Sequence, residues 1–424
     1  MNEVFLYFIW QNRLYGKASC HALTGESIEI VNPGIRNKES GPDFFDARVK
    51  INGILWAGNV EIHVKASDWI QHGHNNDAAY KNVILHVVYE YDCNIEGPSG
   101  TAIPVLQLDF SKELLTRYNK LIENNSPIHC SGDTEKGEPF RTMAFLHSIA
   151  LERLSEKSES IHKLLKQNGN NWEEAFYLTL ARNFGFHINA LPFEMLARSV
   201  PLKAIVRHRN SLLQIEALLF GQAGLLGKNE INDEYFFRLK SEYEMLAGKF
   251  KLQPINTAAW KFSPVRPGNL PTIRIAQFAA LVYHSFPLFS RMIENESPEE
   301  TDAMFRVEPS EYWKTHFSFQ TQSSELVKKM GRNSFHLIVI NTVAPFLYLY
   351  GLVKDDEKYA QRAVDLLESI PPEQNYIVAL WKKEGINAES ALETQAMIQL
   401  FRNYCSKKRC VECTIGAMII TQKN

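Results

Sequence analysis

Apolar and polar residues alternate along several short segments in the first 110 residues of the chain. These segments are rich in Val, Ile and aromatic residues and end at Asn, Gly or Pro, as β-strands do. They cover residues 27–33, 47–53, 55–65, 82–92 and 102–110. Before them, residues 1–16 carry Glu3 ahead of an apolar run, which predicts an amphipathic first helix. The predicted order is helix, three strands, helix and two strands.

From about residue 112 onward the apolar residues recur every three or four positions, for example in 143–166 and 233–250. This spacing is typical of amphipathic helices. Polar loops and proline-rich turns near residues 124–139 and 260–271 predict domain boundaries. We therefore expect an α+β domain, a central mixed sheet with flanking helices, at 1–125. Two helical domains are expected at 126–265 and 266–424.

Composition and charge narrow the possible partners. Lys and Arg number 46 against 48 Asp and Glu, so no overall basic field indicates a nucleic-acid or membrane surface. The longest apolar stretch, 335–351, is interrupted by Asn341 and Pro345, which favours a kinked core helix over a membrane span. Six cysteines in 424 residues argue against a secreted disulfide framework. The expectation is a cytoplasmic protein without a membrane partner.

The segment 55–65, read as a strand, places Glu61, His63 and Lys65 on one face. An ordinary solvated strand also mixes such residues. However, Asp43 follows a Gly-Pro turn just before the neighbouring strand, which brings it beside Glu61. Two carboxylates suit Mg²⁺ or Mn²⁺ as ligands. Lys65 or a neutral His63 would orient or deprotonate the attacking water, or stabilise the negative charge that develops on the phosphate. The combination fits phosphodiester hydrolysis.

This order of elements, with Pro42-Asp43 before the second strand and Glu61 in the third, resembles the PD-(D/E)XK, or restriction-endonuclease-like, nucleases. The whole chain is similar to an uncharacterised bacterial family, a domain of unknown function grouped with them. The resemblance implies Asp43 and Glu61 as metal ligands and nucleic acid, most simply DNA, as the partner. The motif lysine is expected at the position of His63, while a lysine follows only at Lys65, so the identity of the catalytic base is open.

The residues after this strand add candidates for a supporting role, in contact with phosphate or with metal-bound water. They are His72, His74, Asp77 and Tyr80. Gly73 weakens any helix that runs through the two histidines. A His-x-His pair also suits Zn²⁺ or another transition metal, although most such pairs are surface or capping residues.

Three cysteines near the end of the chain, Cys405, Cys410 and Cys413, have the spacing C-x4-C-x2-C. A zinc ion or an iron-sulfur cluster needs a fourth ligand, for which Cys130 is the first candidate and His129 the second. The arrangement is similar to nucleases in which an iron-sulfur cluster clamps the tail to the catalytic domain. The alternative is a set of reduced thiols partly buried in a last helix.

Three functions are compatible with these patterns. The first is a metal-dependent nuclease acting on DNA or RNA. The second is a catalytically inactive nucleic-acid-binding or scaffolding protein that keeps the nuclease-like fold, which the displaced lysine favours. The third is a zinc- or redox-dependent regulator built around the cysteines.

Overall fold

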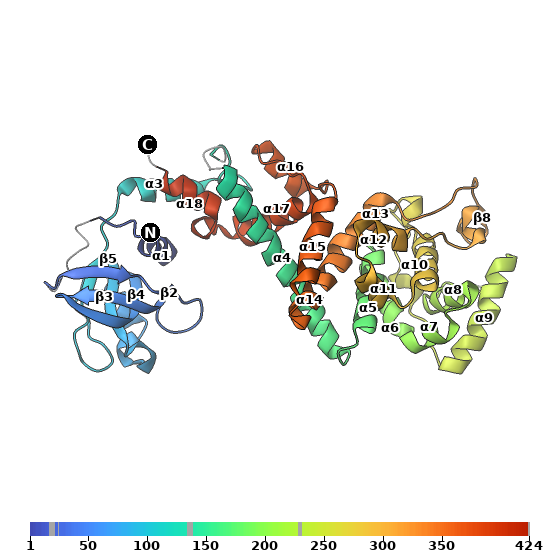
Figure 1. The fold of residues 1–424 in the computed structure, drawn as a ribbon, viewed down its shortest axis with the longest axis horizontal. Coiled ribbons are helices and arrows are strands. Elements are labelled where there is room, and N and C mark those ends of the chain that lie inside the picture. Colours follow the sequence, from blue (N-terminus) through green and yellow to red (C-terminus); the bar gives the residue numbers. More distant parts are fainter. Residues whose placement is uncertain (17–21, 24, 134–138, 228–230, 423–424) are drawn as a thin grey trace. The chain divides into compact units, whose positions relative to one another are not determined.

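The computed structural model describes residues 1–16, 22–23, 25–133, 139–227 and 231–422 (Figure 1). The chain divides into two compact units. Unit 1 comprises Met1–Phe145, Ala379–Asn387 and Leu400–Asn424, and unit 2 comprises Leu146–Val378 and Ala388–Gln399. Unit 1 holds a mixed sheet and unit 2 is mainly helical, which confirms an α+β part followed by a helical part. The boundaries at residues 125 and 265 stay predictions.

The sheet of unit 1 has the order β1-β3-β4-β5-β6, with β2 paired to β3. Its strands are β1 Ile28–Asn32, β2 Ile35–Arg36, β3 Phe44–Ile51, β4 Ile54–Lys65, β5 Val83–Glu90 and β6 Val105–Gln107. Strands β1, β3 and β4 pair in antiparallel fashion, while β4, β5 and β6 are parallel. All five predicted strands form, and within this sheet the two-residue β2 is additional.

Strands β3 and β4 are joined by a two-residue hairpin turn. Asn52 and Gly53 both have positive φ values, 51° and 81°. This is the geometry of the type I′ turn, in which Asn-Gly is the preferred pair because its twist matches that of the strands. The turn sets the register of the hairpin by placing Ile51 opposite Ile54.

A β-bulge in β3 then changes this register, at a point where Asp46 has a φ of 53°. Beyond the bulge Phe44 pairs with Val60. Continuing this register places Asp43, which directly precedes β3, opposite Glu61, and the Asp43 N–H donates to Glu61 Oε2. The uninterrupted hairpin register would place Asp43 one residue further along β4, on the other face of the sheet. The bulge therefore brings the two acidic side chains to the same face.

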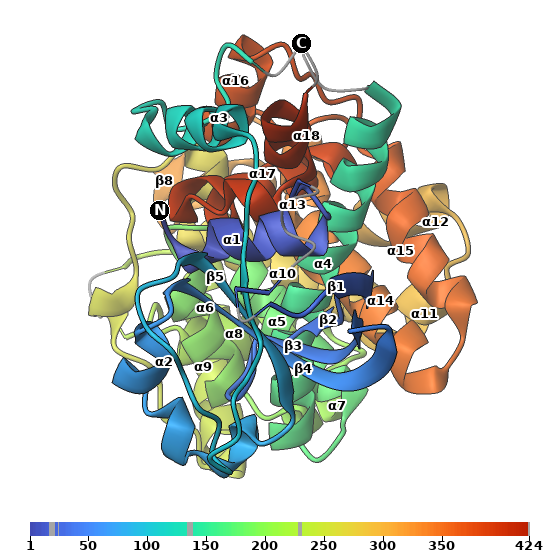
Figure 2. The same ribbon diagram turned by 90° about the vertical axis from the view of Figure 1, so that its left-hand side faces the viewer.

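Helix α1 (Glu3–Gln11) packs its apolar side against the sheet at β4. It lies between the sheet and the helices α3 (Lys112–Glu123) and α18 (Thr414–Thr421) in both views of the chain (Figures 1 and 2). Asn2 caps the helix by accepting from the backbone N–H of Phe5, and the Phe5 ring stacks on Tyr118 of α3 at 4.6 Å. Helix α1 is thus packed against the sheet on one side and against α3 on the other.

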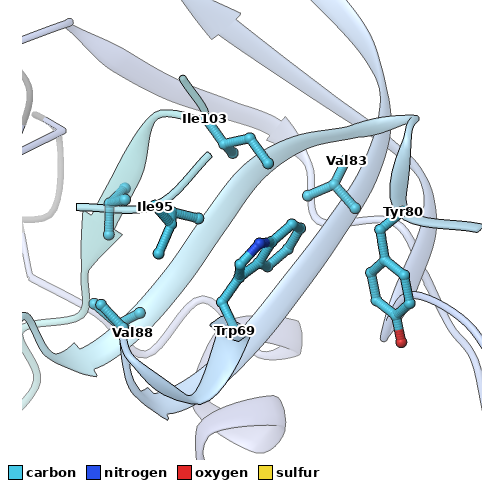
Figure 3. Close-up of a cluster of buried hydrophobic side chains, with 8 residues drawn as sticks. Trp69, Tyr80, Val83, Val88, Ile95 and Ile103 are labelled. Atoms are coloured by element: carbon cyan, nitrogen blue, oxygen red, sulfur yellow. The ribbon is translucent and has the colours of Figure 1, made fainter. Parts of the chain in front are cut away.

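Between β4 and β5 the chain forms α2 (Asp68–Gln71) and two 3₁₀ turns, His74–Asn76 and Ala78–Tyr80. Gly73, with a φ of 76°, separates α2 from the first turn, in line with its expected effect. This segment covers an apolar cluster centred on Trp69, whose Nε1 donates to the Glu96 carbonyl at 3.1 Å (Figure 3). The cluster contains Ala66, Trp69, Tyr80, Val83, Val88, Ile95, Ile103 and Val105.

The helices from α4 onward account for most of the remaining chain. They are α4 Pro139–Gln167, α5 Trp172–Phe184, α6 Ala190–Ser199, α7 Leu202–His208, α8 Leu212–Gln222, α9 Glu234–Phe250, α10 Pro271–Ser285, α11 Leu288–Glu294, α12 Pro298–Phe305, α13 Arg332–Ile338, α14 Ala344–Lys354, α15 Glu357–Ser369, α16 Tyr376–Lys383 and α17 Ala391–Asn403. Two short strands, β7 His316–Ser318 and β8 Thr321–Gln322, form a hairpin in unit 2.

The apolar stretch predicted as an interrupted core helix spans α13, a π-helical segment Val339–Val343 and α14. Within the part of the chain described here, Arg332–Lys354 is long and apolar enough to cross a membrane by length and composition alone. Yet 61% of its most apolar window is buried inside the protein, as in the core helix of a soluble protein. The irregular segment contains Asn341 and directly precedes Ala344-Pro345, where a missing N–H disturbs helical hydrogen bonding.

Candidate functional site

Asp43 and Glu61 are held next to each other by two hydrogen bonds, each from a backbone N–H to a carboxylate oxygen. The N–H of Asp43 donates to Glu61 Oε2 at 3.0 Å, and the N–H of Ile62 donates to Asp43 Oδ2 at 2.9 Å. Glu61 is only 5% exposed. Each carboxyl group commits one oxygen to this exchange, so its orientation is fixed while the second oxygen can serve another partner. The expected neighbourhood of Asp43 and Glu61 is present in the structure.

Both acids hold their protons unusually tightly. Burial, followed by the nearby charge of Glu61, raises the pKa of Asp43 to about 7. Burial likewise raises the pKa of Glu61 to about 8. Tyr7 of α1 hydrogen-bonds to Asp43, which partly offsets this effect. A divalent cation would favour the ionised form of both groups and displace their protons.

Three histidines form a group beside the same carboxylates, and two of them contact Glu61. Within the described ranges, His63, His72 and His74 form the group whose ligand atoms all lie within 4.8 Å of one another. The Nε2 atoms of His74 and His63 lie 3.2 and 3.5 Å from Glu61 Oε1. Burial, followed by the neighbouring imidazoles, lowers the pKa of His63 to about 2, which keeps this ring neutral. Neutral imidazole is the metal-binding form.

The donor set bears on the choice of metal. Mg²⁺ prefers oxygen ligands and water, whereas imidazole nitrogens suit zinc, iron and similar ions. Three imidazoles beside two carboxylates therefore fit Mn²⁺ or Zn²⁺ better than Mg²⁺. Residues His63, His72, His74, Glu61 and Asp43 are the side chains that would hold such an ion.

The sequence did not point to His86 as part of this group. It is fully buried, and its Nδ1 has no hydrogen-bond partner. Its Nε2 lies 2.9 Å from Nδ1 of His63. A metal ion on Nε2 of His63 would leave the proton on Nδ1, where it can donate to His86 and fix the ring. The signal that could have found His86 is its position opposite Glu61 in the parallel β4–β5 register.

Aromatic side chains hold the histidines in place. The Tyr80 ring stacks on His74 at 3.8 Å, and Trp69 contacts both His74 and His86 with ring centroids 5.4 and 5.3 Å apart. Burial, followed by the carboxylates of Glu61 and Asp43, raises the pKa of Tyr80 to about 12, so its hydroxyl is neutral. The apolar cluster of Figure 3 thus supports the histidine group from one side.

Two other predicted residues lie apart from the carboxylates. Lys65 is half exposed, and its Nζ stands 3.8 Å from Glu90. Its charge also acts on Asp92. Asp77 is exposed and caps the last 3₁₀ turn by accepting from the N–H of Ala79. Their places in a site stay predictions: Lys65 pairs with Glu90, while the charge of Asp77 acts on His74 and Tyr80.

Glu3 of α1 lies beside the histidines. Burial raises its pKa, and the charges of His72 and His74 act on it in the opposite direction. The Tyr7 hydroxyl donates to its Oε2 at 3.5 Å. The first helix therefore contributes a further carboxyl group next to the Asp43 and Glu61 pair.

Fold and site together define an α+β unit with a buried carboxylate and histidine centre on one face of a mixed sheet. Residues 3–376 match the family described as "Protein of unknown function (DUF2851)", and the chain belongs to this family. No curated protein and no solved structure matches it. The match ends before Cys405, Cys410 and Cys413.

Proposed function

We propose that unit 1 is a metal-dependent nuclease with a restriction-endonuclease-like fold. The observation that carries the proposal is the reciprocal hydrogen bonding of Asp43 and Glu61, with the imidazoles of His63 and His74 against the remaining Glu61 oxygen and His72 in the same histidine group. Buried acids that keep their protons without a cation are typical of sites built to bind one. The sequence predicted Mg²⁺ or Mn²⁺; because of the imidazole donors we favour Mn²⁺ or Zn²⁺ over Mg²⁺.

The chemistry would be hydrolysis of a phosphodiester. The ion would lower the pKa of a bound water and stabilise negative charge on the phosphoryl oxygens. Glu3 is the adjacent carboxyl group outside the locked pair, and its raised pKa suits a proton acceptor. The water oxygen would attack phosphorus as one of its protons passes to Glu3, and the leaving oxygen would depart as an alcohol that takes its proton from solvent. Lys65, bound to Glu90, would take no direct part.

Basic side chains near α1 support a polyanionic substrate. The Arg36 guanidinium lies 4.9 Å from the centre of the Tyr7 ring, and its buried Nε has no hydrogen-bond partner. Arg36, Lys38 and Arg409 line a pocket of about 360 Å³ in unit 1. Guanidinium and ammonium groups of this kind position the phosphate backbone of nucleic acids.

The position of Lys65 favours the rival function, a nucleic-acid-binding or scaffolding protein without catalysis. The lysine of the nuclease motif stabilises charge at the reacting phosphate, and here the ammonium group faces Glu90 instead. The rival predicts nucleic-acid binding that needs no divalent ion and survives Asp43→Ala.

A cleavage assay separates the two. Labelled single- and double-stranded DNA and RNA are incubated with the full chain and Mn²⁺, Zn²⁺ or Mg²⁺. The proposal predicts cutting that is lost in Glu61→Gln and retained in the control Glu29→Gln, a surface residue paired with Lys50 on the same sheet. Binding without cutting under every metal would refute it in favour of the rival, and the substrate that is cut distinguishes DNA from RNA.

A further inference from the structure

Unit 1 contains a second cluster of metal-binding side chains, remote in sequence from the histidines. Cys130 follows α3, Cys405 and Cys410 begin the 3₁₀ turns Cys405–Lys407 and Cys410–Glu412, and Cys413 is the N-cap of α18. All four thiols are free and buried, with exposed fractions of 7–8%. Cys93, the remaining described cysteine, is only partly buried.

Electrostatic coupling shows that the four thiols lie close together. Burial raises the pKa of every one of them, to about 12 for Cys410 and about 11 for Cys413. The charge on an ionised Cys413 raises the pKa of Cys130, Cys405 and Cys410 further. Cys130 also acts on Cys405. Residues from two distant parts of the chain thus meet in one place.

The backbone around the three C-terminal cysteines forms tight, hydrogen-bonded turns. The turns close through the N–H of Lys408 on the Cys405 carbonyl at 3.0 Å and the N–H of Cys413 on the Cys410 carbonyl at 3.3 Å. Gly416 permits this packing, because a Cβ there would lie 2.1 Å from the Cys410 carbonyl oxygen. The N–H groups of Ile415 and Gly416 hydrogen-bond to the Cys413 sulfur.

Two kinds of contact offset part of the effect of burial on the thiol pKa values. Backbone N–H groups at a helix N-terminus stabilise a thiolate, and α18 supplies two of them to Cys413. The positive charge of Lys408 acts on Cys410 in the same sense. Several thiolates in one buried place repel each other, and a thiophilic metal removes that repulsion.

We propose that Cys130, Cys405, Cys410 and Cys413 are the four ligands of an iron-sulfur cluster. Each thiol gives up its proton as its sulfur bonds to iron. In a zinc tetrathiolate with bonds of about 2.3 Å the sulfurs stand about 3.8 Å apart. Among the residues described, three ligand atoms come within 4.8 Å of one another at the histidines and not at these cysteines. In every set of three of these sulfurs at least one pair is therefore more than 4.8 Å apart, which favours a cluster over a single zinc ion.

The centre would bind the C-terminal segment to the rest of unit 1. The turn at Cys410 contacts both α1 and α3, and α18 packs on α3. Arg117 of α3 donates to the Ile420 carbonyl at 3.3 Å, and Lys408 donates to the Ile122 carbonyl at 2.8 Å. Helix α1 carries Glu3, so the centre would also stabilise one wall of the histidine site. This inference does not depend on the proposed nuclease activity.

The test measures the metal itself. The full chain is purified without oxygen, and its iron, acid-labile sulfide, zinc and visible absorption are determined for the wild type, Cys410→Ser, Cys130→Ser and the control Cys93→Ser. We expect iron and sulfide in the wild type and in Cys93→Ser, with loss in the other two. If the wild type contains zinc instead, and the same two variants lose it, the four cysteines form a metal site but the iron-sulfur cluster is refuted. A wild type that holds no metal after reconstitution would refute both the metal site and the cluster.

A second measurement does not require stable variants. Alkylation of the folded wild type, mapped by peptide, should modify Cys93 readily and the four clustered cysteines only after chelation has removed the metal. Equal modification of the four before and after chelation would overturn the proposal.

Discussion

The buried acid Glu61 predicts a substitution that stabilises the metal-free protein while removing its metal site. Its pKa is raised to about 8 from an ordinary value of 4.5. Between these pH values the folded protein binds more protons than the unfolded chain, so this group makes stability fall as pH rises. Glu61→Gln keeps the shape and the acceptor for the N–H of Asp43 but has no charge. It should therefore be more stable than the wild type above pH 8.

The size of the effect follows from the pKa. Each tenfold change in proton affinity is worth about 1.4 kcal/mol, so the ionised Glu61 costs on the order of 5 kcal/mol in the metal-free protein. Local relaxation and water reduce this to roughly 2–4 kcal/mol. For a unit of this size, about 1 kcal/mol shifts Tm by about 2–4 °C, which gives a rise on the order of 5–15 °C at alkaline pH. Near pH 5 the wild-type carboxyl group is protonated and the difference should vanish.

The assay is thermal unfolding of metal-free protein at pH 5 and above pH 8, with and without Mn²⁺ or Zn²⁺. Glu29→Gln is the matched control, because its carboxylate is exposed and paired with Lys50 on the same sheet. The wild type should gain stability from the ion at high pH and Glu61→Gln should not. If Glu61→Gln lowers Tm equally at both pH values, Glu61 is a structural anchor and the reasoning fails.

Three further outcomes are expected. Deletion of Asp46 removes the bulge and turns Asp43 to the other face, so metal-induced stabilisation should disappear, whereas Asp46→Gly should keep it. His86→Phe removes the partner of His63 Nδ1 and should weaken Mn²⁺ or Zn²⁺ binding in calorimetry by about 10–100-fold; unchanged affinity would contradict the role given to His86. Lys65→Ala should keep nuclease activity within about threefold, because it removes only an exposed ion pair, and near-complete loss of cutting would return Lys65 to the site.

The strand and helix pattern of the chain could be predicted because alternation and turn residues are local signals. The approach of Asp43 to Glu61 was also predicted, yet the bulge at Asp46 that produces it was not. One extra residue in a strand leaves the apolar pattern almost unchanged while it reverses the face of everything beyond it. The correct neighbourhood was inferred from position, and its cause became visible only in the register of β3 and β4.

The histidine group depended on information that periodicity does not carry. His74 reaches Glu61 and His72 reaches His63 after the chain breaks at Gly73, and His86 reaches His63 because β5 pairs in parallel with β4. Lys65 illustrates a second limit of prediction from strand periodicity. Strand period assigns it to the face of Glu61, but this face becomes exposed toward the end of β4, where the lysine pairs with Glu90.

The division of the chain has a consequence for biosynthesis. The chain leaves unit 1 after Phe145 and returns to it at Ala379 and again at Leu400. The whole of unit 2 is therefore translated before unit 1 is complete. At about 5–20 residues per second, the first helix and the sheet wait on the order of ten seconds or more for the C-terminal segment. During this interval α1 and α3 lack the contacts that α18 and the Cys410 turn later provide. This protein therefore most needs protection from aggregation during the period in which its N-terminal part has been made and its C-terminal segment has not.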